Sequence, residues 1–270
     1  MGNVSIVFFD IDGTLVSFKT HRVPQSTLDA VAALRSRGIK VYIATGRPLP
    51  FIDNLGELEY DGMVTVTGAH CFTREGKVIC HRPVPADDVE RVVAHLESGK
   101  DAYPVIFVCE EEMFVTEVNA DVEQIARLLD IRMPQVCPPS RARGKNVLQL
   151  ISFFGADREK EMMSRLMPGC VSMRWHPLFT DVIARGVSKS VGIDHVLAYE
   201  GIPLEEAMAM GDGGNDVAMV EHVPYGVAMG NACEELKRVA AYVTDTVDHD
   251  GVAKALQHFG LMKQPDGPSE

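Results

Sequence analysis

The strongest constraint on the fold comes from short apolar runs that are each followed by polar residues. Residues 4–9 form an apolar run of strand-forming residues, and Asp10 stands directly behind it. A short run of this kind indicates a strand buried on both faces, as in a parallel sheet. A helix predicted over about 26–37, which Gly38 would end, and an apolar strand predicted over 39–45 complete a β-α-β unit. The sequence therefore predicts an α/β fold.

The same alternation returns near the C-terminus. Residues 207–212 and 225–230 predict two more short buried strands, and helices are predicted over 215–223 and 232–240. These segments and the N-terminal β-α-β unit need each other to complete one sheet. We therefore expect a single Rossmann-like parallel-sheet core built from both ends of the chain.

The middle of the chain has a different pattern. Amphipathic helices are predicted over 87–97 and 119–130. Five strand candidates lie among them, at 104–109, 113–117, 147–154, 171–175 and 178–184. This order fits an α+β module inserted into the α/β domain. We expect a catalytic core of residues 1–81 and 187–270 and an inserted cap of residues 82–186.

Charge and cysteine content exclude several classes of protein. The 270 residues include 26 basic and 38 acidic side chains, a net charge of −12, which disfavours a nucleic-acid-binding surface. An anionic substrate would then need a local cluster of cations. The six cysteines include no C-x-x-C pair, so neither a zinc site nor a disulfide framework is indicated. No run has the length or pattern of a membrane span or signal peptide. We expect a cytoplasmic protein without a nucleic-acid, membrane or obligate protein partner.

Asp10 and Asp12 follow the first predicted strand and allow four interpretations. A calcium loop fails because an EF-hand needs a glutamate at its twelfth position, which here is His21. A polar turn that caps a strand remains possible, because Asp and Gly are common turn residues. A phosphorylated signalling aspartate and a catalytic pair also remain. Ligands in open α/β sheets bind beyond the carboxyl ends of the strands, which favours the catalytic pair.

Other strand ends supply polar residues of matching type. The strand at 39–45 leads into "IATGR", and the strand at 207–212 leads into "GDGGND". These two motifs contain the following candidates: Thr45, Gly46, Arg47, Asp212, Asn215 and Asp216. Each motif alone is a weak signal, because Thr-Gly and Gly-Asp turns are common.

Four motifs taken together carry a family resemblance. "DIDGTLV", "IATGR", the Lys189 of "GVSKSVGI" and "GDGGND" occur in this order, with a long insertion after the second. The chain thereby resembles the haloacid dehalogenase superfamily of aspartate-dependent phosphatases, and most closely its Cof-like branch, whose α+β cap is inserted between the second and third motifs. "DGMVTVTGAH" and "DTVDHDGVAKAL" extend the likeness to nearly the whole chain. One departure is Thr67, where the branch usually has Asn.

The resemblance implies a role for each aspartate after the first strand. Asp10 would attack phosphorus and form an aspartyl-phosphate, which divides hydrolysis into two easier steps. Asp12 would protonate the leaving alcohol and later take a proton from the attacking water. Because alternating strand positions point in opposite directions, this requires the chain to leave the strand at Asp10 and turn through Gly13.

The resemblance also implies Mg²⁺ as cofactor. A carboxylate that attacks a phosphate dianion needs its charge neutralised, and Mg²⁺ prefers carboxylate, phosphate and water ligands. By resemblance its ligands would be Asp10, the backbone carbonyl of Asp12 and Asp212. Asp216 would lie in the next shell or act through water.

Donors to the phosphoryl group are expected from Thr45, the Gly46 amide, Lys189 and Asn215, with Arg47 a weaker candidate that could instead pair with a carboxylate. A basic loop in the inserted module, with Arg141, Arg143 and Lys145, is a candidate for contacts with the leaving group. The pair Trp175 and His176 is another candidate. A solvated loop and a core tryptophan are the alternatives. We expect hydrolysis of small phosphorylated metabolites, with sugar phosphates as the substrate class that the resemblance implies. A phosphomutase of the same superfamily is the nearest rival, and a receiver-like signalling module is a remote one.

Overall fold

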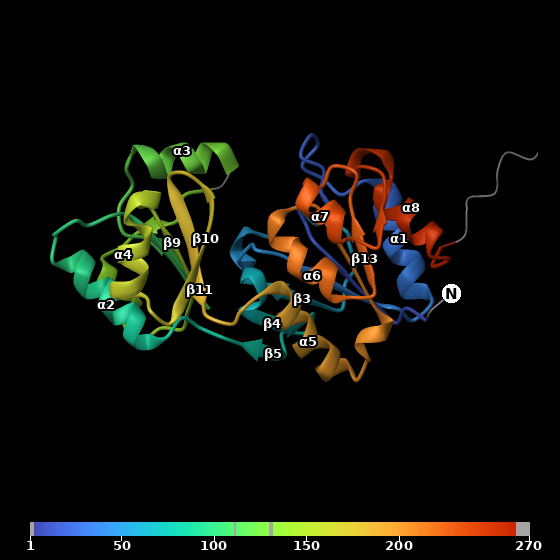
Figure 1. Cartoon of the computed structure of the whole chain (residues 1–270), viewed down its shortest axis with the longest axis horizontal. Coiled ribbons are helices and arrows are strands. Elements are labelled where there is room, and N and C mark those ends of the chain that lie inside the picture. The colour runs from blue at the N-terminus through green and yellow to red at the C-terminus, as the bar shows by residue number, and fades with distance from the viewer. Residues whose placement is uncertain (1–2, 111, 130–131, 263–270) are drawn as a thin grey trace, which may run out of the picture. The chain divides into compact units, whose positions relative to one another are not determined.

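The computed structural model describes residues 3–110, 112–129 and 132–262, and only the backbone at residues 129 and 175. Contacts divide the chain into two compact units (Figure 1). Unit 1 comprises Met1–His81 and Ser188–Glu270, and unit 2 comprises Arg82–Val187. Each unit has its own sheet.

The described part of unit 1 holds an eight-stranded sheet in the order β14-β13-β12-β1-β2-β3-β4-β5. The strands are β1 (Ile6–Phe9), β2 (Lys40–Ala44), β3 (Gly62–Thr65), β4 (His70–Thr73), β5 (Val78–His81), β12 (Ala207–Gly211), β13 (Tyr225–Ala228) and β14 (Tyr242–Val243). Strands β14 to β3 run parallel, and β4 and β5 extend the sheet antiparallel. The carboxyl ends of six parallel strands therefore meet along one edge.

Helices cover this sheet because its strands are apolar on both faces. All four residues of β1 are buried, as the continuous apolar run predicted. The helices are α1 (Gln25–Ser36), α5 (Lys189–Glu200), α6 (Val217–His222), α7 (Glu234–Val239) and α8 (Gly251–His258). Helix α1 contacts α8, whereas α6 contacts both α5 and α7. The connections β1-α1-β2 and β12-α6-β13 run in opposite directions along the sheet, so right-handed crossovers place α1 and α6 on opposite faces.

Strands β4 and β5, like β3 and β14, have no counterpart in the sequence prediction. Each of β4 and β5 is four residues long and contains at most three consecutive apolar residues. Their extended conformation depends on pairing, because Met63 lies opposite Phe72 and Cys71 lies opposite Cys80 in the ladder. Sequence periodicity carries little information about such short paired segments.

The described part of unit 2 holds a six-stranded sheet in the order β10-β11-β9-β6-β7-β8. Its elements are α2 (Ala86–Glu97), β6 (Val105–Cys109), β7 (Met113–Val115), α3 (Ala120–Leu129), β8 (Gln135–Val136), β9 (Val147–Ser152), α4 (Ala156–Leu166), β10 (Cys170–His176) and β11 (Phe179–Ala184). Neighbouring strands pair antiparallel, except that β7 and β8 are parallel. Residue 130, the last of the helix predicted over 119–130, lies outside the described residues.

Both faces of the unit 2 sheet are apolar. Val105 and Phe107 of β6 belong to a core cluster with residues of α2 and α4, whereas Ile106 and Val108 belong to a second cluster with residues of α3. Successive residues of a strand point to opposite faces, so helices cover the sheet from both sides. The parallel strands of unit 1 confirm the α/β class with a parallel-sheet core that the sequence predicted.

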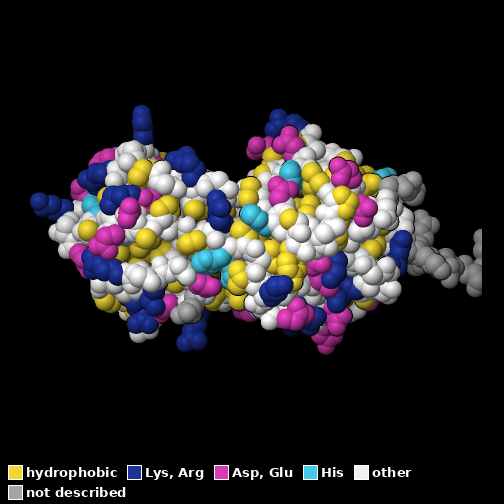
Figure 2. Space-filling view, turned by 90° about the horizontal axis from the view of Figure 1, so that it is seen from below, with side chains coloured by type: hydrophobic (Ala, Val, Ile, Leu, Met, Phe, Trp, Pro, Cys, Tyr) yellow, Lys and Arg dark blue, Asp and Glu magenta, His cyan; other side chains and the backbone are white. Residues whose placement is uncertain are grey.

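Charged side chains of both signs lie on the surface. On the face in Figure 2, acidic and basic side chains are interspersed over both units. Among the described residues, no helix combines the length and apolar composition needed to cross a membrane.

Candidate active site

A buried lysine bridges two buried carboxylates at the carboxyl edge of the unit 1 sheet. Asp10 directly follows β1, and its amide donates to the Met210 carbonyl of β12. Lys189 begins α5 and is fully buried. Its Nζ lies 2.6 Å from Asp10 Oδ1 and 2.5 Å from Asp216 Oδ1. Segments from three distant parts of the sequence therefore meet in one ion-pair network.

A third carboxylate, Asp212, joins this group. Carboxylate oxygens of Asp10, Asp212 and Asp216 lie within 4.8 Å of one another. Asp216 Oδ2 also accepts hydrogen bonds from the amides of Asp212 and Gly213, which fixes its orientation. The name acidic cluster is used below for Asp10, Asp212 and Asp216.

Burial and mutual repulsion shift the pKa values in the acidic cluster. Burial, followed by the charge of Asp216, raises the pKa of Asp10 well above its usual range despite the nearby ammonium group. The same two causes raise the pKa of Asp212 to about 7. Burial alone would lower the pKa of Lys189, but the attraction of Asp10 and Asp216 outweighs this effect and raises it. The ammonium group of Lys189 therefore does not fully balance the negative charge of the three carboxylates.

The acidic cluster fits a divalent metal ion on charge and ligand chemistry. Its three carboxylates and the Lys189 ammonium leave two uncompensated negative charges. Three convergent oxygen donors suit a hard cation such as Mg²⁺. A divalent cation would balance the charge that raises the pKa values of Asp10 and Asp212.

Gly13 turns the chain after Asp10, as the sequence prediction required. Its φ is +78°, and a Cβ at this position would lie 2.1 Å from Asp212 Oδ2. Only glycine combines this conformation with such close approach. The turn brings the backbone after Asp12 against the acidic cluster.

The side chain of Asp12 has a different partner from that of Asp10. Its carboxylate accepts two parallel hydrogen bonds from Arg47, one from Nε and one from the NH2 nitrogen, each 2.7 Å long. Arg47 is held in turn by donation to the Phe51 carbonyl at 2.8 Å. The sequence left open whether Arg47 binds phosphate or a carboxylate. In this structure it binds the carboxylate of Asp12.

The predicted phosphoryl donors gather around Gly46. Thr45 directly follows β2 in the sequence and is buried. Its Oγ1 accepts a hydrogen bond from the Arg47 amide, so the hydroxyl proton of Thr45 stays available for donation. A Cβ placed on Gly46 would lie 3.3 Å from Asn215 Nδ2 and 3.5 Å from Thr67 Oγ1. Polar atoms that follow β3 and β12 therefore lie beside Gly46.

The turn after β3 is strained. Val66 and Thr67 have φ of +51° and +54°, and both are β-branched. Such residues rarely adopt a left-handed conformation, and each costs on the order of 1–3 kcal/mol. Strain of this kind persists only where the surroundings enforce it.

Asn231 is a site residue that the sequence analysis did not identify. Its Nδ2 donates to the Gly13 carbonyl at 2.8 Å and to Asp212 Oδ2 at 3.2 Å, and its Oδ1 accepts from the Val247 amide at 2.9 Å. It follows β13, so the rule that polar residues collect at parallel strand ends could have identified it. Asn231 fixes both the turn after the first strand and one carboxylate of the acidic cluster.

The basic loop of unit 2 is paired within that unit. Arg141 and Lys145 both contact Glu112, and Arg143 contacts Glu90 and Glu97. His176 accepts a hydrogen bond from the Leu178 amide and stacks on Phe179. The side chain of Trp175 lies outside the described residues.

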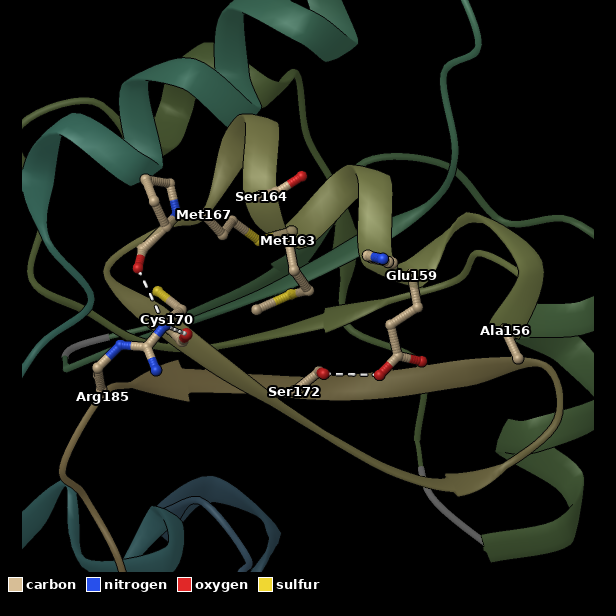
Figure 3. Close-up of a pocket in the computed structure, with 10 residues that line it drawn as sticks. Ala156, Glu159, Met163, Ser164, Met167, Cys170, Ser172 and Arg185 are labelled. Atoms are coloured by element: carbon tan, nitrogen blue, oxygen red, sulfur yellow. Dashed lines mark hydrogen bonds between the residues drawn. The ribbon is translucent and has the colours of Figure 1, made fainter.

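A shallow groove in unit 2 lies beside α4 and β10 (Figure 3). Glu159 and Ser172 are hydrogen-bonded across it, and Arg185 donates to the Cys170 carbonyl at one end. None of the phosphoryl-binding candidates lines this groove. It is therefore not the site that the sequence motifs predicted.

The chain is similar to known hydrolases and phosphatases. The family model of haloacid dehalogenase-like hydrolases matches residues 7–256. The chain is 45% identical over 272 residues to the 5-amino-6-(5-phospho-D-ribitylamino)uracil phosphatase YcsE of Bacillus subtilis, covering 96% of this chain and 97% of YcsE.

Two solved structures are similar over most of the chain. The phosphatase BT1666 of Bacteroides thetaiotaomicron has a TM-score of 0.87 and 38% identity, with 96% of each chain covered. The subclass IIB sugar phosphatase BT4131 has a TM-score of 0.84 and 42% identity, with 96% of this chain and 100% of that chain covered.

Proposed function

The chain belongs to the haloacid dehalogenase-like hydrolases and is a phosphatase, and we propose that it is a Mg²⁺-dependent enzyme that hydrolyses small sugar or polyol phosphates through an aspartyl-phosphate. The observation that carries the proposal is the Asp10–Lys189–Asp216 network. It holds a carboxylate at a strand end, oriented by a buried ammonium group and next to a cluster suited to a divalent cation.

In the proposed mechanism, Asp10 attacks phosphorus and the alcohol leaves. Lys189 holds Oδ1 of Asp10 and thereby orients the carboxylate for attack. Asp12 gives a proton to the leaving oxygen, then accepts one from the water that attacks the aspartyl-phosphate, which releases inorganic phosphate and restores Asp10. Thr45, the Gly46 amide and Asn215 donate to the phosphoryl oxygens.

Mg²⁺ would be held by Asp10, Asp212 and the carbonyl of Asp12, with Asp216 beside it. When bound, it reduces the repulsion between the attacking carboxylate and the phosphoryl oxygens. The uncompensated charge of the acidic cluster supports this assignment.

The names of two relatives support the proposed substrate class. BT4131 is described as a sugar phosphatase, and the named substrate of YcsE carries a phosphoribityl group. In both cases the leaving group is a polyhydroxylated alcohol. We propose that unit 2 is the cap that selects this group. None of the six cysteines, all of which lie in the described residues, forms a disulfide, and this supports the proposal of a reducing, cytoplasmic location.

A substrate screen tests the proposal. The purified protein is assayed for inorganic phosphate release from sugar, polyol, nucleoside and pyridoxal phosphates, with Mg²⁺ or with EDTA. We expect turnover of sugar or polyol phosphates that EDTA abolishes and that is absent in Asp10→Asn but retained in the exposed control Asp245→Asn. Absence of turnover by the folded wild type would refute the proposal, and formation of an isomeric sugar phosphate without phosphate release would favour the phosphomutase.

The covalent intermediate has its own test. In Asp12→Asn the attacking water has no base, whereas p-nitrophenolate leaves without a proton donor. We therefore expect p-nitrophenyl phosphate to give one equivalent of p-nitrophenol and a protein that has gained one phosphoryl group by mass spectrometry, located at Asp10. Steady turnover without a phosphorylated protein would argue against this division of roles.

A further inference from the structure

We propose that Thr67 is a substrate-binding residue whose hydroxyl donates a hydrogen bond to the phosphoryl group. This inference rests on the proposed function and adds a donor that the sequence motifs did not provide. The argument rests on the position of the turn, the environment of the hydroxyl and the strain of the backbone.

The turn at residues 66–68 is packed between two parts of the candidate active site. The Thr67 amide donates to the Thr45 carbonyl at 3.0 Å, and the Val66 amide donates to the Arg47 carbonyl at 3.2 Å. On the other side, a Cβ on Gly68 would lie 2.1 Å from the carbonyl oxygen of Ser188, the residue before Lys189. The turn is therefore clamped between the phosphoryl-binding loop after β2 and the start of α5.

Most of Thr67 is buried, and its hydroxyl has no internal hydrogen-bond partner among the described residues. The residue is 8% exposed, and its Oγ1 makes no hydrogen bond to any part of the chain that the structure describes. This atom lies 3.5 Å from the position a Gly46 Cβ would occupy, where Asn215 Nδ2 lies at 3.3 Å. A hydroxyl that the described chain leaves without a partner is available to donate to a ligand, and both polar atoms lie beside the same position next to Gly46.

The backbone conformation of Thr67 also supports a role in binding the phosphoryl group. Threonine is a poor choice at a φ of +54°, because its branched Cβ crowds the backbone in the left-handed region. Glycine or asparagine would relieve the strain, but glycine lacks a hydroxyl and asparagine places its polar atoms further out. A strained residue enforced by neighbouring active-site segments is typical of a functional position.

The experiment compares Thr67 in the turn with Thr65 at the end of the preceding strand β3. Thr67→Val keeps the shape and removes only the unpartnered hydroxyl. The control Thr65→Val makes the same change at a buried threonine whose Oγ1 donates to the His70 carbonyl at 3.1 Å. Inorganic phosphate is titrated by calorimetry into each protein in the presence of Mg²⁺, and Tm is measured in parallel.

We expect Thr67→Val to weaken phosphate binding at least tenfold without lowering Tm, because a hydrogen bond to a charged group is lost and no internal bond is broken. Thr65→Val should lower Tm and leave phosphate affinity unchanged. Thr67→Ser, which keeps the hydroxyl, should bind phosphate within about twofold of the wild type. In turnover assays, Thr67→Val should lower kcat/KM by a similar factor for aryl and sugar phosphates, since the phosphoryl group is common to both.

Unchanged phosphate affinity in Thr67→Val would overturn the inference while leaving the proposed function intact. An equal loss of affinity in Thr67→Val and Thr67→Ser would also overturn it, because the hydroxyl would then not be the cause. A loss confined to sugar phosphates would place Thr67 at the leaving group instead. If the wild type neither bound phosphate nor hydrolysed any phosphate ester, the proposed function would fail together with the inference.

Discussion

Arg47 and Asp12 form a two-pronged ion pair in which Nε and the NH2 nitrogen each lie 2.7 Å from a different carboxylate oxygen. Both side chains are about 30% exposed (29% and 31%), so a substrate can reach the pair. This geometry fixes the orientation of the residue that we assign to proton transfer.

Replacing Arg47 should therefore impair the leaving-group step. We expect Arg47→Met to lower kcat for a sugar phosphate about tenfold or more, with a smaller effect on p-nitrophenyl phosphate, because nitrophenolate leaves without a proton donor. Arg47→Lys, which keeps the charge but loses the planar fork, should be intermediate. Steady-state kinetics with both substrates measures the difference. An equal loss for both substrates would instead indicate that Arg47 acts on the phosphoryl group.

Removing Lys189 should destabilise the protein because two buried carboxylates lose their partner. Breaking a buried ion pair by removing one member costs about 3–5 kcal/mol, and we expect Lys189→Met to lose a free energy of unfolding of this order. Urea denaturation of the metal-free protein measures it. Lys254→Met, at the exposed pair with Asp245, is the control and should leave the midpoint unchanged. Wild-type stability in Lys189→Met would show that the buried network is not formed in solution.

Mg²⁺ should stabilise the protein more at pH 8 than at pH 5. The pKa of Asp212 is about 7 in the folded protein against 3.8 as a model value, since burial and Asp216 disfavour its charged form. For a carboxyl group with a raised folded pKa, the stabilising contribution is complete below about pH 4 and is lost as pH rises towards 7. Mg²⁺ binds the ionised form and offsets this loss, whereas protons compete with it at low pH.

Thermal denaturation across this pH range, with Mg²⁺ or with EDTA, measures the effect. In Asp212→Asn the Mg²⁺-dependent rise in Tm should be small, and its pH dependence should be much weaker. An equal Tm shift at pH 5 and pH 8 in the wild type would contradict the assignment of Asp212 as a ligand.

Gly13→Ala should separate backbone strain from damage to the site. Gly13 and Gly38 have nearly the same φ, +78° and +76°, but a Cβ on Gly13 would meet Asp212 at 2.1 Å, whereas a Cβ on Gly38 would meet nothing within 4 Å. Each alanine should cost roughly 1–2 kcal/mol of stability for the left-handed conformation. Only Gly13→Ala should also lower kcat/KM, by about 100-fold, because it displaces a metal-binding carboxylate. Similar activity in the two variants would show that the close approach to Asp212 is unimportant.

The sequence predicted the parallel strands β1, β2, β12 and β13 because their signal is local, but it did not predict the parallel strands β3 and β14. Residues 6–9 are apolar throughout, and both faces of β1 are buried. Strands β4 and β5 were not predicted, since only pairing across the sheet makes them extended. The residues of the candidate site were found through motif order, and their assigned roles remain predictions.

The sequence by itself determined the α/β class, the family resemblance and which polar residues stand at strand ends. These properties follow from local hydrophobicity and from short motifs. The tertiary structure alone decided the pairing of the charges: Lys189 lies between Asp10 and Asp216, and Arg47 binds Asp12. It also revealed the unpartnered hydroxyl of Thr67. Such contacts depend on the register and proximity of segments far apart in the chain, which no local pattern encodes.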